Sequence, residues 1–214
     1  SDEQLEEIRS DSQVEMVATS DILGYAEFDA LTSETIPYLY IQSFSEELFD
    51  VFPIQLQEGR LPKNEHEVII SPYMQANERE GQTTQVGDVL ELEVGDRMWE
   101  GQRLTAYEGF MGEAYAREQG VEPEHLENTE HMSFTVVGIY NTTPNMHYGT
   151  VSYQLIAGPS SSGSLSEYHD VYLRTQYPAD IYDYMDTIEC DATSTNESLL
   201  RWYGVADNDN LQEI

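Results

Sequence analysis

Positive charge is scarce in this sequence. The 214 residues include 41 Asp and Glu but only 9 Lys and Arg, which gives a formal net charge of −32 at pH 7. Proteins that bind nucleic acid neutralise its phosphates with clustered Lys and Arg side chains. So few and scattered basic residues exclude nucleic acid as a partner, and they disfavour an anionic membrane surface for the same reason.

Cysteine and long apolar runs are also nearly missing. Cys190 is the single cysteine of the sequence, which excludes a disulfide within the chain and a zinc site built from several cysteines. The longest apolar run, Phe134–Tyr140, is far shorter than the roughly 20 residues that a membrane-spanning helix needs. Because the first residues form no signal peptide and include no initiator Met, we expect the sequence to be an excised segment of a longer protein.

Complete catalytic motifs are absent as well. Residues 158–162 resemble a nucleophile elbow but end in Ser where the motif needs Gly. His66 starts a possible zinc-protease pattern, yet Ile70 stands where the second His should be. Residues 207–211 begin like a calcium loop and then lose the third ligand to Leu. We therefore expect no catalytic residue, no cofactor, no metal and no enzymatic activity.

Two weaker groups of residues remain. Glu124-His125 and Glu130-His131 lie six residues apart in what reads as an acidic loop, with His147 and His169 elsewhere. Such side chains could hold a divalent cation if three or four converged, but chance co-occurrence is the simpler interpretation in so acidic a chain.

The second group is aromatic and occupies the C-terminal third of the chain. Core packing would account for most of these rings and an interaction surface for the rest. The members are Tyr148, Tyr153, Tyr168, Tyr172, Tyr177, Tyr182, Tyr184, Trp202 and Tyr203. Asn141 and Asn196 begin sequences with the form of glycosylation acceptors, which says nothing about where the protein resides.

The apolar content is enough for a folded domain with an acidic surface, at 39% hydrophobic and 11% aromatic residues. Seven short stretches, rich in β-branched and aromatic residues or alternating in polarity, predict strands; they are 13–18, 36–44, 67–70, 89–94, 133–140, 150–156 and 168–175. Capping residues, Pro and Gly predict helices at 2–10, 46–52, 72 onward for two turns, 108–120, 179–188 and 198–203. Strands and helices do not alternate strictly, so the expected class is α+β.

Three segments resemble a known family. The run 56–71 (LQEGRLPKNEHEVIIS), Gly87–Leu92 (GDVLEL) and Phe134–Ile139 (FTVVGI) follow one another in the order seen in bacterial ABC transporter permeases of the FtsX/MacB type. Residues 196–205 also resemble the segment that precedes the second transmembrane helix of such permeases. The resemblance covers residues 36–205, and 97–131 reads as an insertion outside the pattern.

The resemblance implies a two-lobed α+β domain on the extracytoplasmic face of the cell membrane, similar to the MacB-like periplasmic core domain. The chain would be the soluble loop between transmembrane helices 1 and 2. Residues 1–55 and 165–214 would form a membrane-proximal, porter-like lobe. Residues 56–164 would form an inserted, mostly-β distal lobe, with 97–131 as its insertion.

The resemblance also implies a function without catalysis. The domain would couple ATP hydrolysis by a cytoplasmic ATP-binding subunit to substrate export or to activation of a partner protein outside the membrane, in a permease that pairs with a second copy. The cargo, the choice between export, hydrolase activation and peptide sensing, and calcium binding to the acidic surface stay open. The alternative is a secreted hydrolase or carbohydrate-binding module that uses aromatic platforms and paired carboxylates.

Overall fold

A computed structural model describes most of the chain in two compact units. The residues that it describes are 2–52, 54–141, 151–161, 166, 168–190, 193 and 195. The smaller unit holds the described residues up to Ala18 and those from Val171 onward, and the larger unit runs from Thr19 to Asp170. The boundary between them falls inside two strands, Val14–Glu27 and His169–Thr175.

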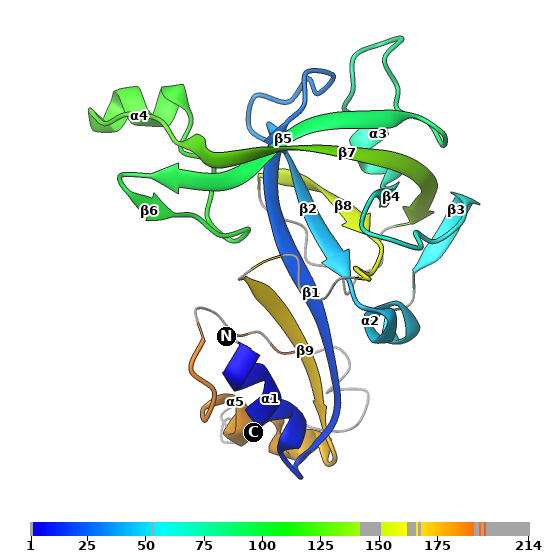
Figure 1. Cartoon of the computed structure of the whole chain (residues 1–214). Helices are drawn as coiled ribbons and strands as arrows, with labels where there is room; N and C mark the ends of the chain where they lie inside the picture. Colours follow the sequence, from blue (N-terminus) through cyan, green and yellow to red (C-terminus); the bar gives the residue numbers. More distant parts are fainter. Residues whose placement is uncertain are drawn as a thin grey trace, which may run out of the picture. The chain divides into compact units, whose positions relative to one another are not determined.

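Helices and a mixed sheet make up the described residues (Figure 1), and the α+β prediction is confirmed. The helices are α1 (Asp2–Ser10), α2 (Glu46–Val51), α3 (Pro72–Gln75), α4 (Glu113–Gln119), the 3-10 helix η1 (Pro178–Asp180) and α5 (Ile181–Met185). The strands are β1 (Val14–Glu27), β2 (Tyr38–Phe44), β3 (Gln55–Gly59), β4 (Glu67–Ile70), β5 (Val89–Trp99), β6 (Gln102–Arg103), β7 (His125–Asn141), β8 (Ser152–Ala157) and β9 (His169–Thr175).

Six strands of the described residues pair in a closed ring in the order β1-β2-β8-β4-β7-β5 and back to β1. The β2–β8 and β4–β7 pairs are parallel and the other four are antiparallel. The ring closes between β5 and β1 at a single residue pair, Tyr25 with Gly95. The long strand β7 also pairs with β3, and β6 pairs with β5. This barrel-like sheet is the scaffold of the larger unit.

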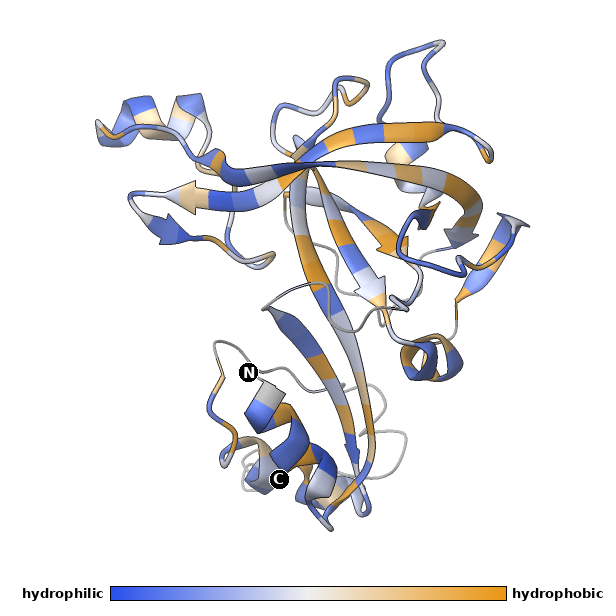
Figure 2. Cartoon of the chain, viewed as in Figure 1, coloured by the Kyte–Doolittle hydropathy of each residue, from blue (hydrophilic) through white to orange (hydrophobic). Residues whose placement is uncertain are grey.

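The interior of the ring is the main apolar core. Side chains alternate between the two faces of a strand, and along β2 Leu39 and Ile41 face the interior while Tyr38 and Tyr40 belong to a second cluster on the other face. Figure 2 shows the same alternation of polar and apolar residues along β5. Sixteen buried residues fill the interior: Ala26, Leu31, Leu39, Ile41, Val68, Ile70, Met74, Leu90, Leu92, Val94, Phe134, Val136, Ile139, Tyr153, Leu155 and Ala157.

The smaller unit is built from α1, the start of β1, most of β9, η1 and α5. Leu5 and Ile8 lie one turn apart on α1 and are half-buried, while the glutamates between them are exposed, as an amphipathic surface helix requires. The amide of Gln4 donates to the Glu189 carbonyl at 3.0 Å, which connects α1 to the segment after α5. Tyr184 of α5 is buried, and burial raises the pKa of its hydroxyl.

Local capping explains where several helices begin and end. Ser45 Oγ accepts a hydrogen bond from the Leu48 amide at 3.2 Å at the start of α2, and Ser71 Oγ accepts one from Met74 at the same distance at the start of α3. These are N-cap bonds. Gly120 ends α4 in the left-handed conformation, with φ of +75°, which glycine adopts without steric cost.

The structure departs from several of the expected boundaries. Residues 55–59, where no helix or strand was predicted, form β3; β1 continues past 18 to Glu27; and α3 is a single turn instead of two. Strands β5 and β7 extend into the segment 97–131 from both sides, and β6 and α4 lie between them; that this segment is an insertion relative to the family stays a prediction. The predicted helix at 198–203 lies outside the described residues.

The two lobes expected from the resemblance, residues 1–55 with 165–214 and residues 56–164, stay a prediction. The compact units of the structure divide near residues 18 and 170. Strand β2 lies between β1 and β8 inside the ring, and this long-range pairing keeps residues 38–44 with the larger unit.

Candidate functional site

The three family-like segments meet at the second half of β7, which contains the third of them. Gly59 at the end of β3 pairs with Gly138, while β4 lies on the other edge of the same stretch of β7. A Cβ on Gly138 would stand only 2.6 Å from the Arg60 carbonyl oxygen. Glycine is therefore required where these backbones approach each other.

Arg60 and Glu67 form the charged part of this junction. Arg60 Nη1 and Nη2 donate to the two Glu67 carboxylate oxygens at 2.6 and 2.5 Å, and the Lys63 amide donates to Oε2 at 2.9 Å. The bidentate hydrogen bond from Arg60 is the main cause that lowers the pKa of Glu67 to about 2. The pair holds the turn after β3 against the start of β4.

Gly87 and Asp88 bring the second segment to the same place. The Gly87 amide donates to the Val136 carbonyl at 2.8 Å, and the Asp88 carbonyl accepts from the Val136 amide at 2.9 Å. Asp88 Oδ2 accepts the Gln85 amide at 2.8 Å, which closes the turn before β5. Gly87 has φ of +101°, a conformation that favours glycine. The three segments thus set the register of β3, β4 and β5 on β7, which is a structural task.

Arg97 makes the most deeply buried ion pair among the described residues. Its Nε and Nη2 donate to Glu124 Oε1 and Oε2 at 2.8 and 2.9 Å, and both side chains are fully buried. The remaining donors reach the carbonyls of Thr105, Glu108 and Gly109 at 3.1, 3.4 and 3.0 Å. All guanidinium donors are used, so the pair fastens the loop 105–109 to β5.

Two tyrosines line the same guanidinium. The Arg97 Cζ lies 5.3 Å from the centroid of Tyr25 and 5.6 Å from that of Tyr38, within cation–π range. Burial raises the pKa of both tyrosine hydroxyls, so both rings stay neutral. Sequence analysis missed Arg97. The signal available was weak: one Arg, three residues after the end of the predicted strand 89–94.

The predicted acid–histidine group is not brought together. Glu124 is committed to Arg97, and the following residues belong to strand β7, so the expectation of an acidic loop was wrong. His125 Nε2 lies 2.9 Å from Glu127, and His169 Nδ1 lies 2.9 Å from Asp21. His147 lies outside the described residues. Within the described part of the chain, no group of three or more His, Cys, Asp or Glu could hold a metal ion.

His131 is flanked by two carboxylates on the exposed face of β5 and β7. Its Nδ1 lies 2.9 Å from Glu93 Oε1 and its Nε2 lies 3.1 Å from Glu91 Oε2. The hydrogen bond to Glu93 is the main cause that raises the pKa of His131. Because the two carboxylates contact opposite nitrogens of the ring, they frame an imidazolium and do not converge on one point. Glu130, the other acid of the predicted group, is exposed.

The tyrosines of the C-terminal third serve different purposes. Tyr153 and Tyr184 are buried, whereas Tyr168 and Tyr177 are 42% and 68% exposed. Tyr172 and Tyr182 are half-buried. Tyr148, Trp202 and Tyr203 lie outside the described residues. The described members thus include both core residues and exposed rings, and they are divided between the two units.

The incomplete motifs have structural roles where they are described. The Gly158 amide donates to the carbonyls of Asn64 and Glu67, each at 3.2 Å, and its carbonyl accepts from Ser43 Oγ at 2.7 Å, so this turn anchors the end of β8. Asn141 is exposed at the end of β7, where its side chain accepts from Gln57. Cys190 is exposed. Asn196 and residues 207–211 lie outside the described part.

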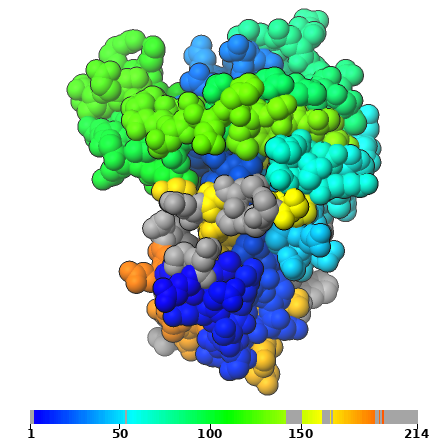
Figure 3. Space-filling model, in the orientation of Figure 1, coloured from blue at the N-terminus to red at the C-terminus, as the bar shows by residue number. Residues whose placement is uncertain are grey.

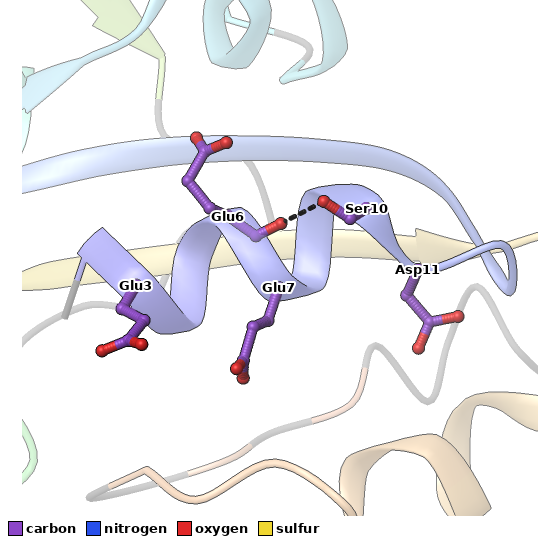
Figure 4. Close-up of a pocket in the computed structure, with 5 residues that line it drawn as sticks. All are labelled: Glu3, Glu6, Glu7, Ser10 and Asp11. Atoms are coloured by element: carbon purple, nitrogen blue, oxygen red, sulfur yellow. Dashed lines mark hydrogen bonds between the residues drawn. The ribbon is translucent and has the colours of Figure 1, made fainter.

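A shallow hollow on the smaller unit is lined by acids of one helix. Figure 4 shows Glu3, Glu6, Glu7 and Ser10 of α1 with Asp11 around it; Ser10 Oγ donates to the Glu6 carbonyl at 2.6 Å. An open acidic surface of this kind is well solvated and needs no ligand. In the described residues, none of the helices is long and apolar enough to cross a bilayer.

Comparisons with known proteins give structural likeness only. No family model and no curated protein matches the sequence. The extracellular domain of the noncanonic ABC-type transporter YknZ from Gram-positive bacteria is 13% identical, with 95% of this chain and 84% of that one covered and a TM-score of 0.45. The periplasmic region of MacB from Actinobacillus actinomycetemcomitans is 12% identical, with 99% and 80% covered and a TM-score of 0.41.

A domain of a putative permease protein from Porphyromonas gingivalis is also 12% identical, with 99% of this chain and 72% of that one covered and a TM-score of 0.35. The structural neighbours are thus domains of ABC-type transporters and of a putative permease, the kind of protein that the three sequence segments resemble. At such identities and TM-scores the likeness assigns no function.

Proposed function

We propose that this chain is the extracytoplasmic domain of an ABC transporter permease of the FtsX/MacB type, without catalytic activity of its own. The observation that carries the proposal is the convergence of the three family-like segments at the second half of β7. The three segments lie far apart in the sequence and follow one another in the order seen in one family. In the structure they meet at one strand. A shared pattern of this kind specifies a fold, and its residues are glycines, turn residues and an ion pair.

The chemistry of the singled-out side chains agrees with a role without catalysis. Glu124 is neutralised by Arg97, Glu67 by Arg60, and His131 lies between two carboxylates on an open strand surface. An active site needs a nucleophile or acid–base pair beside a cavity that receives a substrate. The hollow on α1 is open and is lined by four acids and Ser10, whose hydroxyl donates to the Glu6 carbonyl.

In the proposed permease, ATP hydrolysis on a cytoplasmic ATP-binding subunit moves the membrane helices, and the domain transmits this movement to cargo or to a partner protein outside. A second permease copy would complete the transporter. The smaller unit includes residues from both parts of the chain that flank the larger unit. A domain joined to the membrane at both ends would receive movement through such a unit.

Cys190 provides the test, because it is the single cysteine of the chain and is exposed. In the full-length protein in its own membrane, with any cysteine outside this sequence replaced by Ser, a membrane-impermeant maleimide added to intact cells should label Cys190, and Cys190→Ser should remove that label. The labelled protein should stay with the membrane after a carbonate wash, and it should co-purify with an ATP-binding subunit after mild solubilisation.

Other outcomes would reject the assignment. Labelling that requires permeabilised cells would place the domain in the cytoplasm. A labelled protein released by the carbonate wash would favour a secreted module. A labelled protein that stays in the membrane but co-purifies with no ATP-binding subunit would reject the assignment to an ABC transporter.

A further inference from the structure

One segment of the larger unit leaves the closed ring and returns to it. We call residues 96–124 the arm: it comprises the end of β5 from Asp96, strand β6, helix α4 and their connections, and it re-enters the sheet at His125. Figures 1 and 3 show it in green, projecting from one side of the larger unit. Nearly all of the arm lies within residues 97–131, which fall outside the family-like pattern. The proposed function therefore assigns the arm no role.

The base of the arm is held rigidly. The buried pair of Arg97 and Glu124 joins its two ends, and the Glu124 carboxylate also accepts the Met111 amide at 2.7 Å. Arg103 of β6 donates to Asp96 at 2.7 Å and stacks on Tyr168, with 3.6 Å between its Cζ and the ring centroid. Removing one partner of a buried ion pair leaves an uncompensated charge at a high cost, so the pair keeps the two ends of the arm together.

The outer part of the arm presents aromatic rings to solvent. Trp99 of β5 and Tyr115 of α4 form an edge-to-face pair with centroids 6.1 Å apart, and Trp99 Nε1 donates to the Glu122 carbonyl at 3.1 Å. Tyr115 is 39% exposed and Tyr107 is 52% exposed. Every residue of α4 except Ala116 is exposed. Trp99 itself is half-buried, so the exposed rings are the two tyrosines. Tyr and Trp rings that are accessible on a surface are typical of recognition sites.

The exposed charges of the arm are almost entirely negative. Arg97 and Arg103 are paired with Glu124 and Asp96, which leaves Arg117 as the exposed arginine of this fully described segment. The exposed acids of the arm are Glu100, Glu108, Glu113, Glu118 and Glu122. Tyr115 and Glu118 lie three residues apart on α4 and therefore on the same face of the helix.

We propose that the Trp99–Tyr115 surface of the arm docks a basic segment of a partner protein or peptide. Lys or Arg side chains would lie over the two rings and pair with the carboxylates beside them. The chain itself uses this chemistry three times, with Arg97 over Tyr25 and Tyr38 and Arg103 over Tyr168. The proposal rests on the arm alone and does not depend on the permease assignment.

The test compares matched variants in binding to a defined probe. The probe is a fluorescein-labelled 12-residue peptide of repeating Arg-Gly-Ser, titrated at ~150 mM salt so that long-range attraction is screened. Tyr115→Leu removes a ring from the arm and Tyr177→Leu removes one that is 68% exposed on the smaller unit. Glu118→Gln removes a charge from the arm and Glu47→Gln removes an exposed one from α2.

We expect saturable binding that each arm variant weakens about twofold to fivefold, with both control variants equal to the parent chain. Glu118→Gln changes an exposed side chain without altering packing, so it tests the proposal even if Tyr115→Leu disturbs α4. Equal losses in arm and control variants, or no saturable binding, would overturn the proposal. Binding of a neutral probe, chitohexaose, at Trp99 with no peptide binding would also overturn it and would indicate a saccharide surface.

Discussion

Arg60, Arg97 and Arg103 show how a very acidic chain uses its few cations. Each pairs with a carboxylate on a neighbouring strand or turn, and the three pairs fasten the turn after β3, the base of the arm and the hairpin of β6. Exposed ion pairs contribute little to the stability of the folded state. Where the pair is bidentate, however, its two parallel hydrogen bonds fix how the guanidinium and the carboxylate are oriented. These arginines therefore act at places where two backbones must meet in one register.

Glu67 is the residue for which this pairing predicts a pH dependence. The pKa of the Glu67 carboxyl is about 2 in the folded chain, whereas a Glu side chain free of such contacts has a pKa of 4.5. A lowered folded-state pKa contributes stability that is present above pH 4.5 and is lost as the pH falls towards 2. We expect the parent chain to melt above Glu67→Gln at pH 6, and the difference in melting temperature to shrink between pH 4.5 and 2.

Arg60→Gln is the matched control for this series, because it removes the partner and leaves the carboxylate. It should reproduce the loss of stability at pH 6 and the shrinking difference at low pH. If Glu67→Gln instead melts a constant number of degrees below the parent chain at every pH, the ion pair is not the source of the effect.

At the scale of elements, β7 organises the larger unit. It pairs with β5 over its first half and with β3 and β4 over its second half. A register shift occurs against each of these neighbours, as expected where one strand must bend to serve several partners. Gly138 lies at the crossing, where the backbone of Arg60 approaches most closely.

Gly138→Ala should therefore destabilise the chain strongly. The new Cβ would lie 2.6 Å from the Arg60 carbonyl and 3.1 Å from that of Glu58, so the backbones must separate. Overpacking of this kind costs about 1–3 kcal/mol, to be measured by urea unfolding. Gly109→Ala is the control, since a Cβ there meets nothing within 4 Å. Equal stability of the two variants would mean that β3 can move away from β7 at little cost.

At the scale of the whole molecule, the charge of −32 dominates. Acids lie close together even within single surfaces: Glu91 and Glu93 share the exposed face of β5, and Asp96 pairs in register with Glu127 of β7. Like charges on neighbouring strands repel, and the repulsion reaches about 8 Å at physiological salt. Repulsion among the surface carboxylates thus lowers the stability of the folded state.

We expect the melting temperature to rise with ionic strength, and the chain to stay monomeric at low salt. Between ~10 mM and ~1 M NaCl the screening length falls from ~30 Å to ~3 Å, which removes most of the repulsion. Sodium sulfate at matched ionic strength separates screening from the general stabilisation by excluded salts. A melting temperature that stays flat or falls across the NaCl series would show that the acids are already well separated or paired.

The local signals in the sequence were sufficient to predict most elements. Ser45, Ser71 and Gly120 cap helices through bonds to residues within four positions, so a short window contains the whole interaction. The alternation along 89–94 and the apolar run 133–140 likewise predicted strands that the structure contains. The order of the family-like segments also came from sequence alone. Helices and strands that depend on interactions within a short segment could therefore be predicted.

Only the tertiary structure decided which segments meet. Glu124 read as a surface acid because the Arg97 that neutralises it lies 27 residues away in the chain. β3 was missed because its apolar residues are few and its strand conformation comes from pairing with β7, where Gln55 lies opposite Asn141 and Gly59 opposite Gly138. The closed ring and the boundaries near residues 18 and 170 depend on the same distant pairings. A strand's partner is chosen by backbone hydrogen bonds and packing across the whole sheet, and no local pattern of residues contains that choice.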